Sequence, residues 1–140
     1  MAAGSALVAR LKRVPLFANL SQKQLRRVSD HGWVAEFPEG KVLCTEGRPG
    51  DSFFVILEGF ALASRRGRKI RTLKAGDYFG EVALLDNAER TATVTAIGPT
   101  RCFMLGRSDF KAALYEEDIA VKLLYTVAQR LRAAEELRSD

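Results

Sequence analysis

The chain has 140 residues and a formal net charge of +5, and 47% of its residues are hydrophobic. This length fits one domain with an ordinary core, so no metal or disulfide framework is needed, and Cys44 and Cys102 show neither zinc-site nor redox spacing. No apolar run is long enough for a membrane-spanning helix or a secretory signal, so we expect a soluble, cytoplasmic protein.

Residues 1–32 are predicted to be a helical segment. Four apolar residues recur at helical spacing up to Pro15, which is expected to end the pattern: Leu7, Val8, Leu11 and Val14. Ser21 offers an N-cap for a second short helix that carries Leu25 and Val28.

Residues 33–107 are predicted to form an antiparallel β-roll. Short apolar or alternating runs recur at intervals of about eight to twelve residues, with glycine- and proline-containing turn signals between them. After Ser108, which is expected to cap a helix, the pattern is helical to residue 140 and predicts one long C-terminal helix. An apolar seam follows one face of that helix: Ile119, Leu123, Val127 and Leu131. The expected fold is therefore mixed α+β, a jelly-roll-like (double-stranded β-helix) domain that covers residues 1–140.

One segment, "FGEVALLDNAERTATV" at 79–94, interrupts the strands with a predicted one-turn helix over Glu81 to Leu85. A helix this short needs a tertiary or functional reason, because it is unstable alone. Its N-terminus exposes backbone N–H groups after Gly80, which allows close approach to the main chain and attracts anions. Arg90 follows with a planar fork of donors that suits a phosphate.

Glu81 restricts the nature of this anion. An ionised carboxylate only accepts hydrogen bonds, so it repels a phosphate unless the same ligand also presents a hydroxyl. The residues alone therefore predict a sugar phosphate, of which a cyclic 3′,5′-nucleotide is one example.

"FGEVALL" followed by "RTATV" resembles the phosphate-binding cassette of the cyclic nucleotide-binding domain family. "FPEGKVLCTEGRPGDSFFVILEGFA" is similar to the first half of that family's β-roll, and the likeness covers residues 14–137. The resemblance implies that Glu81 binds the ribose 2′-hydroxyl and that Arg90 pairs with the cyclic phosphate. It also implies cAMP and/or cGMP as ligand, with no other cofactor and no metal. The cassette candidates are Phe79, Gly80, Glu81, Val82, Ala83, Arg90, Thr91 and Ala92.

The purine is expected to contact residues outside the cassette. Leu62 and Leu73 are the apolar candidates on the strands, and the resemblance implies that the C-terminal helix closes over the base. The helix candidates are Val127, Arg130, Leu131 and Ala134. Ala134 stands where relatives of the catabolite-activator type carry a hydroxyl, which argues against a purine contact shared between two copies. Packing of this helix on the roll explains the same apolar seam equally well.

The predicted function is a sensor or regulatory domain and not an enzyme. His31 is the single histidine, so no Ser-His-Asp or Cys-His arrangement is possible beyond that residue, no carboxylate dyad is marked by the sequence, and a multi-histidine, cupin-like metal enzyme is remote. The alternative is a domain of the same fold that has lost its ligand and serves in interactions. No helix-turn-helix follows Leu137, and no kinase or channel precedes Ser5. The output is therefore expected from an effector domain or protein partner outside this chain, without direct DNA binding.

The positive charge allows two interpretations. Lysine and arginine are spread through the chain, so either an anionic partner or a solvated basic surface explains the net charge. A basic hairpin stands out, and for it solvation, an acidic partner and a membrane surface are all compatible with the sequence: Arg65, Arg66, Arg68, Lys69 and Arg71.

Overall fold

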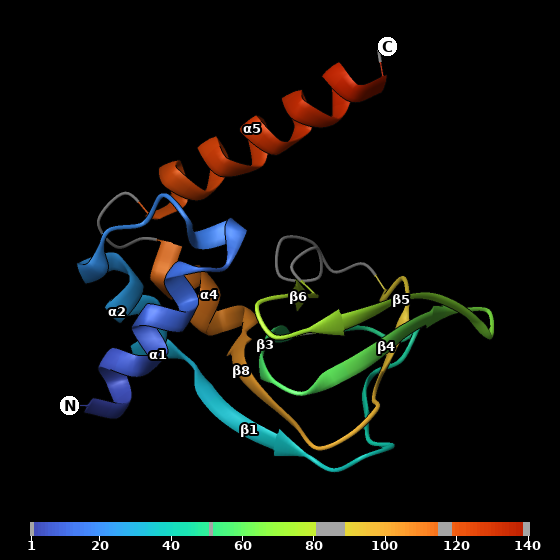
Figure 1. Cartoon of the computed structure of the whole chain (residues 1–140). Helices are drawn as coiled ribbons and strands as arrows, with labels where there is room; N and C mark the ends of the chain where they lie inside the picture. Colours follow the sequence, from blue (N-terminus) through green and yellow to red (C-terminus); the bar gives the residue numbers. More distant parts are fainter. Residues whose placement is uncertain (1, 51, 81–88, 115–118, 139–140) are drawn as a thin grey trace.

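The computed structural model describes residues 2–50, 52–80, 89–114 and 119–138. Figure 1 shows a β-roll with helices gathered at one side of it. The helices are α1 (Ala2–Lys12), the 3-10 helix η1 (Pro15–Phe17), α2 (Gln22–His31), α4 (Arg107–Leu114) and α5 (Ile119–Arg138). The strands are β1 (Trp33–Phe37), β2 (Val42–Cys44), β3 (Ser52–Glu58), β4 (Phe60–Arg65), β5 (Arg68–Lys74), β6 (Tyr78–Phe79), β7 (Thr93–Ala96) and β8 (Thr100–Gly106).

Two antiparallel four-stranded sheets form the roll, with strand orders β1-β8-β3-β6 and β2-β7-β4-β5. The mixed α+β fold and the antiparallel roll predicted from the sequence are confirmed. No helix in the described part of the chain has the length and hydropathy required to cross a membrane.

Strand β3 connects the two hydrophobic cores of the molecule. Side chains alternate between the faces of a strand, so Phe53, Val55 and Leu57 pack against the helices. Phe54 and Ile56 point into the roll, where they meet residues of the second sheet. Five consecutive residues of β3 are buried, which explains why this strand is a continuous apolar run in the sequence.

The N-terminal helices follow the prediction closely. Val8, Leu11 and Val14 are buried in the core that faces the helices. Ser21 caps α2 in a full capping box, because its hydroxyl accepts from the Gln24 N–H while the Gln24 side chain accepts from the Ser21 N–H. Pro15 does not only end a helix: it starts η1, since its fixed φ suits a first helical position.

The C-terminal region differs from the predicted single helix. Strand β8 runs directly into α4 at Arg107, so Ser108 lies inside the first turn and is not the N-cap. A second helix, α5, then begins at Ile119. Only the first part of the predicted seam is buried: Ile119 and Leu123 join the core, whereas Leu131 is 59% exposed.

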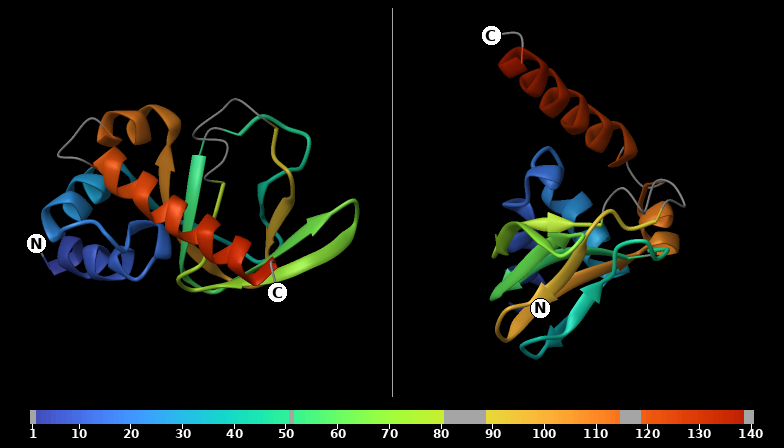
Figure 2. Two further views of the ribbon diagram at one scale, coloured as in Figure 1. Left: turned by 90° about the horizontal axis from the view of Figure 1, so that it is seen from above. Right: turned by 90° about the vertical axis from the view of Figure 1, so that its right-hand side faces the viewer.

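Helix α5 is anchored at its N-terminal end and then leaves the body of the domain. Lys122 Nζ donates to Gln24 Oε1 at 2.8 Å, and Asn19 Nδ2 donates to Thr126 Oγ1 at 2.7 Å. Beyond these contacts the helix stands away from the roll in two perpendicular views (Figures 1 and 2). The one-turn helix predicted over Glu81 to Leu85 lies outside the described residues.

Candidate functional site

Arg90 is the most unusual cation in the roll, because its side chain is almost fully buried. Its relative exposure is 9%. The main chain fixes its position: the Arg90 N–H donates to Arg48 O at 2.8 Å, and the Gly47 N–H donates to Arg90 O at 2.9 Å. The residue is thus held against the loop that precedes β3, and its side chain extends over the N-terminal end of that strand.

The guanidinium of Arg90 is only partly satisfied by the protein. Nη2 donates to Ser52 O at 2.6 Å. Cζ lies 6.0 Å from the centroid of the Phe54 ring, which offers a weak cation–π contact. Within the described part of the chain, Nη1 is buried and has no hydrogen-bond partner. A buried donor without a partner is costly in free energy. We therefore expect Nη1 to bind an acceptor from outside the described part of the chain.

Two glycines make room for this guanidinium. A Cβ built on Gly50 overlaps Nε and Cζ of Arg90, and a Cβ on Gly80 overlaps Nη1. Gly80 also has φ +87°, in the left-handed region that side chains disfavour. The chain therefore approaches Arg90 from two sides with bare backbone, so no side chain from either position covers the guanidinium.

Phe79 positions Gly80 next to Arg90. Its ring stacks on Phe54 with centroids 4.6 Å apart and an interplanar angle of 7°. The strand pairing agrees, since Phe54 and Phe79 are direct partners in the β3–β6 ladder. The same Phe54 ring thus faces Arg90 and fixes the end of β6, from which the cassette begins.

The residues that follow Arg90 are held by hydrogen bonds from neighbouring segments. Arg65 Nε donates to Thr91 O at 2.8 Å, and Cys44 Sγ lies 3.7 Å from Ala92 O. Burial raises the pKa of the Cys44 thiol, and the positive charge of Arg90 lowers it in part. Cys44 is therefore a protonated thiol at neutral pH and shows no nucleophilic activation.

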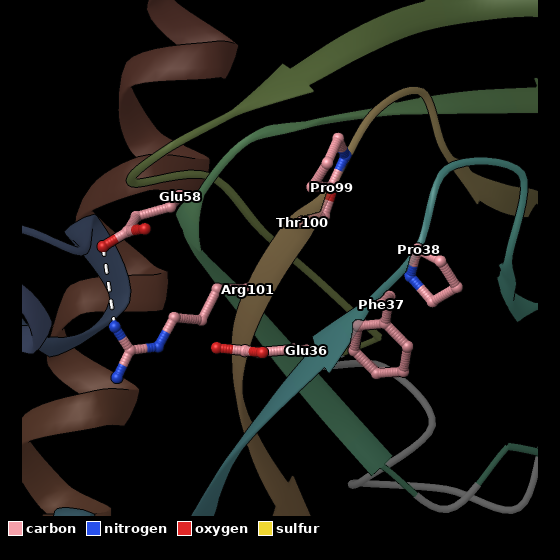
Figure 3. A pocket seen from close by; sticks show the side chains of 7 residues that line it. All are labelled: Glu36, Phe37, Pro38, Glu58, Pro99, Thr100 and Arg101. Carbon is pink, nitrogen blue, oxygen red and sulfur yellow. Dashed lines mark ion pairs between the residues drawn. The ribbon is translucent and has the colours of Figure 1, made fainter.

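A cavity of about 580 Å³ at the opposite end of β3 is a competing site within the described part of the chain (Figure 3). It is lined by Glu36, Phe37, Pro38, Glu58, Pro99, Thr100 and Arg101. Its cation is already compensated, because Arg101 Nη1 lies 3.6 Å from Glu58 Oε1 and faces Glu36 across the β1–β8 ladder. We therefore assign this cavity to cross-strand charge pairing and place the anion site at Arg90.

No metal centre is found in the described ranges, where no three histidine, cysteine, aspartate or glutamate side chains lie close enough to share an ion. The donors that the described chain does provide at Arg90 are N–H groups, which suit an anion and not a cation. The site therefore has the chemistry of oxyanion binding.

A family model for the cyclic nucleotide-binding domain matches residues 34–117, which include β1 to β8 and Arg90. The chain belongs to the cyclic nucleotide-binding domain family. This domain is 38% identical over 106 residues to a cAMP-dependent protein kinase regulatory subunit of Emericella nidulans, across 74% of this chain and 26% of that protein. It is 36% identical over 109 residues to cGMP-dependent protein kinase, isozyme 1, of Drosophila melanogaster, across 72% and 14%. The domain thus spans about a quarter or less of these relatives.

Solved structures agree with this membership. The N-terminal domain of a transcriptional regulator from Streptomyces coelicolor A3(2) has a TM-score of 0.84 and 32% identity, and the match covers 91% of this chain and 95% of that one. The cAMP-bound structure of PfPKA-R has a TM-score of 0.77 and 30% identity, and the match covers 96% and 47%.

The cassette candidates are only partly within the described residues. Phe79, Gly80 and Arg90 lie together at the N-terminal end of β3. Thr91 and Ala92 follow, with the Thr91 side chain exposed and Ala92 half-buried. Glu81, Val82 and Ala83 lie outside the described residues.

The residues predicted to contact the purine base do not gather around Arg90. Leu73 is buried among the residues inside the roll, in the same cluster as Phe54. Leu62 is half-buried and points to the other face of its sheet, since it alternates with the buried Ala61 and Ala63. On α5, Val127 and Leu131 are exposed, and the side chains of Arg130 and Ala134 are not among those described.

Three neighbours of Arg90 were not predicted as site residues: Gly50, Ser52 and Phe54. Gly50 stands in a visible turn signal, but its role depends on how the loop before β3 folds against Arg90. Ser52 acts through its backbone carbonyl, which no residue type marks in a sequence. Phe54 belongs to an apolar run in which each residue fits a core position equally well.

Proposed function

We propose that this chain is a regulatory sensor domain that binds cAMP and/or cGMP, with the cyclic phosphate at Arg90. The observation that carries the proposal is the buried Nη1 of Arg90, which lies beside Gly50 and Gly80 and has no hydrogen-bond partner among the described residues. A phosphate oxygen supplies the missing acceptor and neutralises the buried charge in one contact. A neutral ligand can supply the acceptor but does not neutralise the charge.

Family membership supports a cyclic nucleotide over other phosphates. PfPKA-R holds cAMP in its solved structure, and the sequence relatives include both cAMP- and cGMP-dependent kinase proteins. Both cyclic nucleotides therefore belong to the proposal. Residues 1–140 act in it as one domain without a catalytic step of its own, and the output passes to an effector domain or partner protein outside this chain.

Thermal denaturation tests this function directly. A ligand that binds only the folded state at about one hundred times its Kd stabilises it by about 2.7 kcal/mol. We therefore expect cAMP or cGMP to raise Tm by several degrees, and 5′-AMP to raise it much less at the same concentration. The alternative, a domain that has lost its ligand, predicts an unchanged Tm with every nucleotide.

Glu81→Gln is expected to weaken binding of the ribonucleotide by about 1–3 kcal/mol, because it removes the charge from a proposed bond to the 2′-hydroxyl. Calorimetric titration measures the affinities of wild type and variant for the cyclic ribonucleotide and its 2′-deoxy analogue. The deoxy ligand should bind both proteins nearly equally. An equal loss for both ligands would assign Glu81 a structural role instead.

The C-terminal helix supplies the proposed conformational signal. The hydrogen bonds that hold α5 in the described part of the chain involve Lys122, Thr126 and Gln129. Because α5 exposes Val127 and Leu131, it has an apolar surface available for a bound base. In the proposal, ligand binding shifts α5 towards a position over the purine, and the effector responds to that difference.

A truncation before Val127 tests this movement and retains Ile119, Leu123 and Thr126, which anchor the helix. We expect an affinity loss of about 1–2 kcal/mol from the missing apolar contacts, with weaker discrimination between adenine and guanine. In the full chain, ligand should increase amide-exchange protection at 127–137 more than in the buried strand β3. An unchanged affinity together with unchanged protection of α5 would show that the helix is neither lid nor switch.

A further inference from the structure

The β4–β5 hairpin, residues 60–74, contains the whole excess of positive charge. It has six of the 22 basic residues and none of the 17 acidic residues, so the remainder of the chain carries a formal charge of −1. Basic residues occur throughout the sequence, but outside the hairpin acidic residues balance them. The six are Arg65, Arg66, Arg68, Lys69, Arg71 and Lys74.

The hairpin keeps these cations close together at an energetic cost. Arg65 and Arg68 are direct cross-strand partners, an arrangement that like charges disfavour. Between them Arg66 and Gly67 both have positive φ, which forms the tight turn. Among the described residues, no carboxylate forms an ion pair with a hairpin side chain. Two carboxylates bind the hairpin main chain instead, since Glu46 Oε1 accepts from the Arg66 N–H at 2.9 Å and Asp77 Oδ2 accepts from the Lys74 N–H at 2.8 Å. The tip lies at the far end of the domain from α1, α2 and α4 (Figures 1 and 2).

Strand β5 is also an edge strand, and both of its faces are in solvent except at the buried Leu73. It pairs with β4 alone, so its outer edge has no strand partner in the described ranges. Its first five residues are all exposed. The register of the β4–β5 ladder shifts between Ala63 and Ser64: Arg71 is paired with the buried Ala63, and Lys69 with Ser64. This irregularity places the two cations, although they are two residues apart, on opposite faces of the sheet. Ile70 lies between them and is 47% exposed.

We propose that the edge of β5 binds an extended acidic segment of a partner protein, which adds as a fifth strand to the sheet β2-β7-β4-β5. An added strand also carries side chains on both faces, so carboxylates at successive positions meet Lys69 on one face and Arg71 on the other. Its main chain pairs with the free edge of β5. A flat anionic membrane meets one face of the hairpin only, which is why a polypeptide fits better.

The charge of this edge also selects its partner. Lysine and arginine on an edge strand oppose pairing with a second copy of the same strand. The same residues favour a strand of opposite charge, so repulsion and attraction act together in specificity. Arg65 is not counted among the recognition residues, because its Nε donates to Thr91 O.

Fluorescence anisotropy with two labelled peptides tests the proposal. One is a peptide of about eight residues in which pairs of glutamates alternate with pairs of valines, so that glutamates lie on both faces of an extended strand. The other has proline in place of each valine, so that its charge is equal but it lacks half of the N–H groups. We expect the wild-type chain to bind the glutamate–valine peptide at least about tenfold more tightly than the proline peptide, a difference of about 1.4 kcal/mol.

A pair of charge-reversal variants controls for net charge. K69E/R71E should reduce the affinity for the glutamate–valine peptide at least tenfold. K41E/K111E changes the formal charge by the same amount at exposed positions outside the hairpin. It should change the affinity for the glutamate–valine peptide less than about twofold. Circular dichroism confirms the fold of both variants, and in wild type the peptide should increase amide-exchange protection of Ile70 and Thr72.

Three results would overturn the proposal. Equal affinity for the two peptides would show a general attraction to polyanions without strand pairing. Tighter binding of phosphatidylserine vesicles or duplex DNA than of the glutamate–valine peptide would assign the hairpin to another class of partner. Absence of binding to this peptide would leave the hairpin as a solvated edge protected from self-association.

Discussion

Replacing Arg90 with alanine is expected to weaken the binding of cAMP or cGMP by about 3–5 kcal/mol, a loss of more than about a hundredfold. The substitution removes a buried cation whose Nη1 has no hydrogen-bond partner within the described part of the chain, and it leaves the ligand phosphate without its countercharge. Arg90→Lys should also bind poorly, because a point charge does not reproduce the two-pronged contact of the guanidinium. Isothermal titration calorimetry measures both losses.

Arg101→Ala is the matched control for this prediction. Arg101 lies at the other end of β3 and is paired with Glu58, so its removal should leave nucleotide affinity within about twofold of wild type. Affinity that is unchanged in Arg90→Ala, or lost equally in Arg101→Ala, would contradict the placement of the phosphate at Arg90.

Gly50→Ala is expected to reduce affinity by about 2–5 kcal/mol with little change in Tm, since it displaces the guanidinium from the phosphate. A Cβ at Gly50 overlaps Nε and Cζ of Arg90, which form the mobile end of a long side chain. Its φ is not in the left-handed region, so the backbone accepts alanine without strain. The Arg90 side chain can therefore swing aside and keep the fold intact while losing its position.

Gly98→Ala serves as the control, because a Cβ there meets no atom within 4 Å and its backbone is equally permissive. Calorimetric titration and thermal denaturation of both variants separate binding from stability. If Gly50→Ala binds like Gly98→Ala, the position of the guanidinium does not matter for the ligand. If Gly50→Ala loses Tm together with affinity, the bare backbone at this position serves packing instead.

The alternation of side chains predicted the roll well because it reports local burial. Ser21 was correctly predicted as a cap, since a capping box is a local interaction. Ser108 was wrongly predicted as one, because its residue type does not reveal that β8 continues straight into α4. The seam of α5 was visible as a pattern, but a pattern does not state how far along a helix the packing extends. Leu123 is buried, whereas Leu131, eight residues further along the same seam, is exposed.

The candidate site shows the same limit at the level of tertiary contacts. Arg90 and Gly80 were predicted because they occur within one short segment of recognisable chemistry. Gly50 lies in the loop before β3 and Ser52 begins that strand, about forty residues earlier in the sequence. Only the folded pairing of this loop with Arg90 brings them together. Their contributions are a backbone carbonyl and an absent side chain, neither of which has a signature in composition or spacing.

A crystal structure of this chain grown with cAMP or cGMP tests the central claim most directly, through the distance from Arg90 Nη1 to the nearest ligand oxygen. We expect a cyclic phosphate oxygen within about 3 Å of Nη1, with the nucleotide between Gly50 and Gly80. A nucleotide bound elsewhere, for example in the cavity beside Arg101, with Nη1 still lacking a phosphate contact, would contradict it.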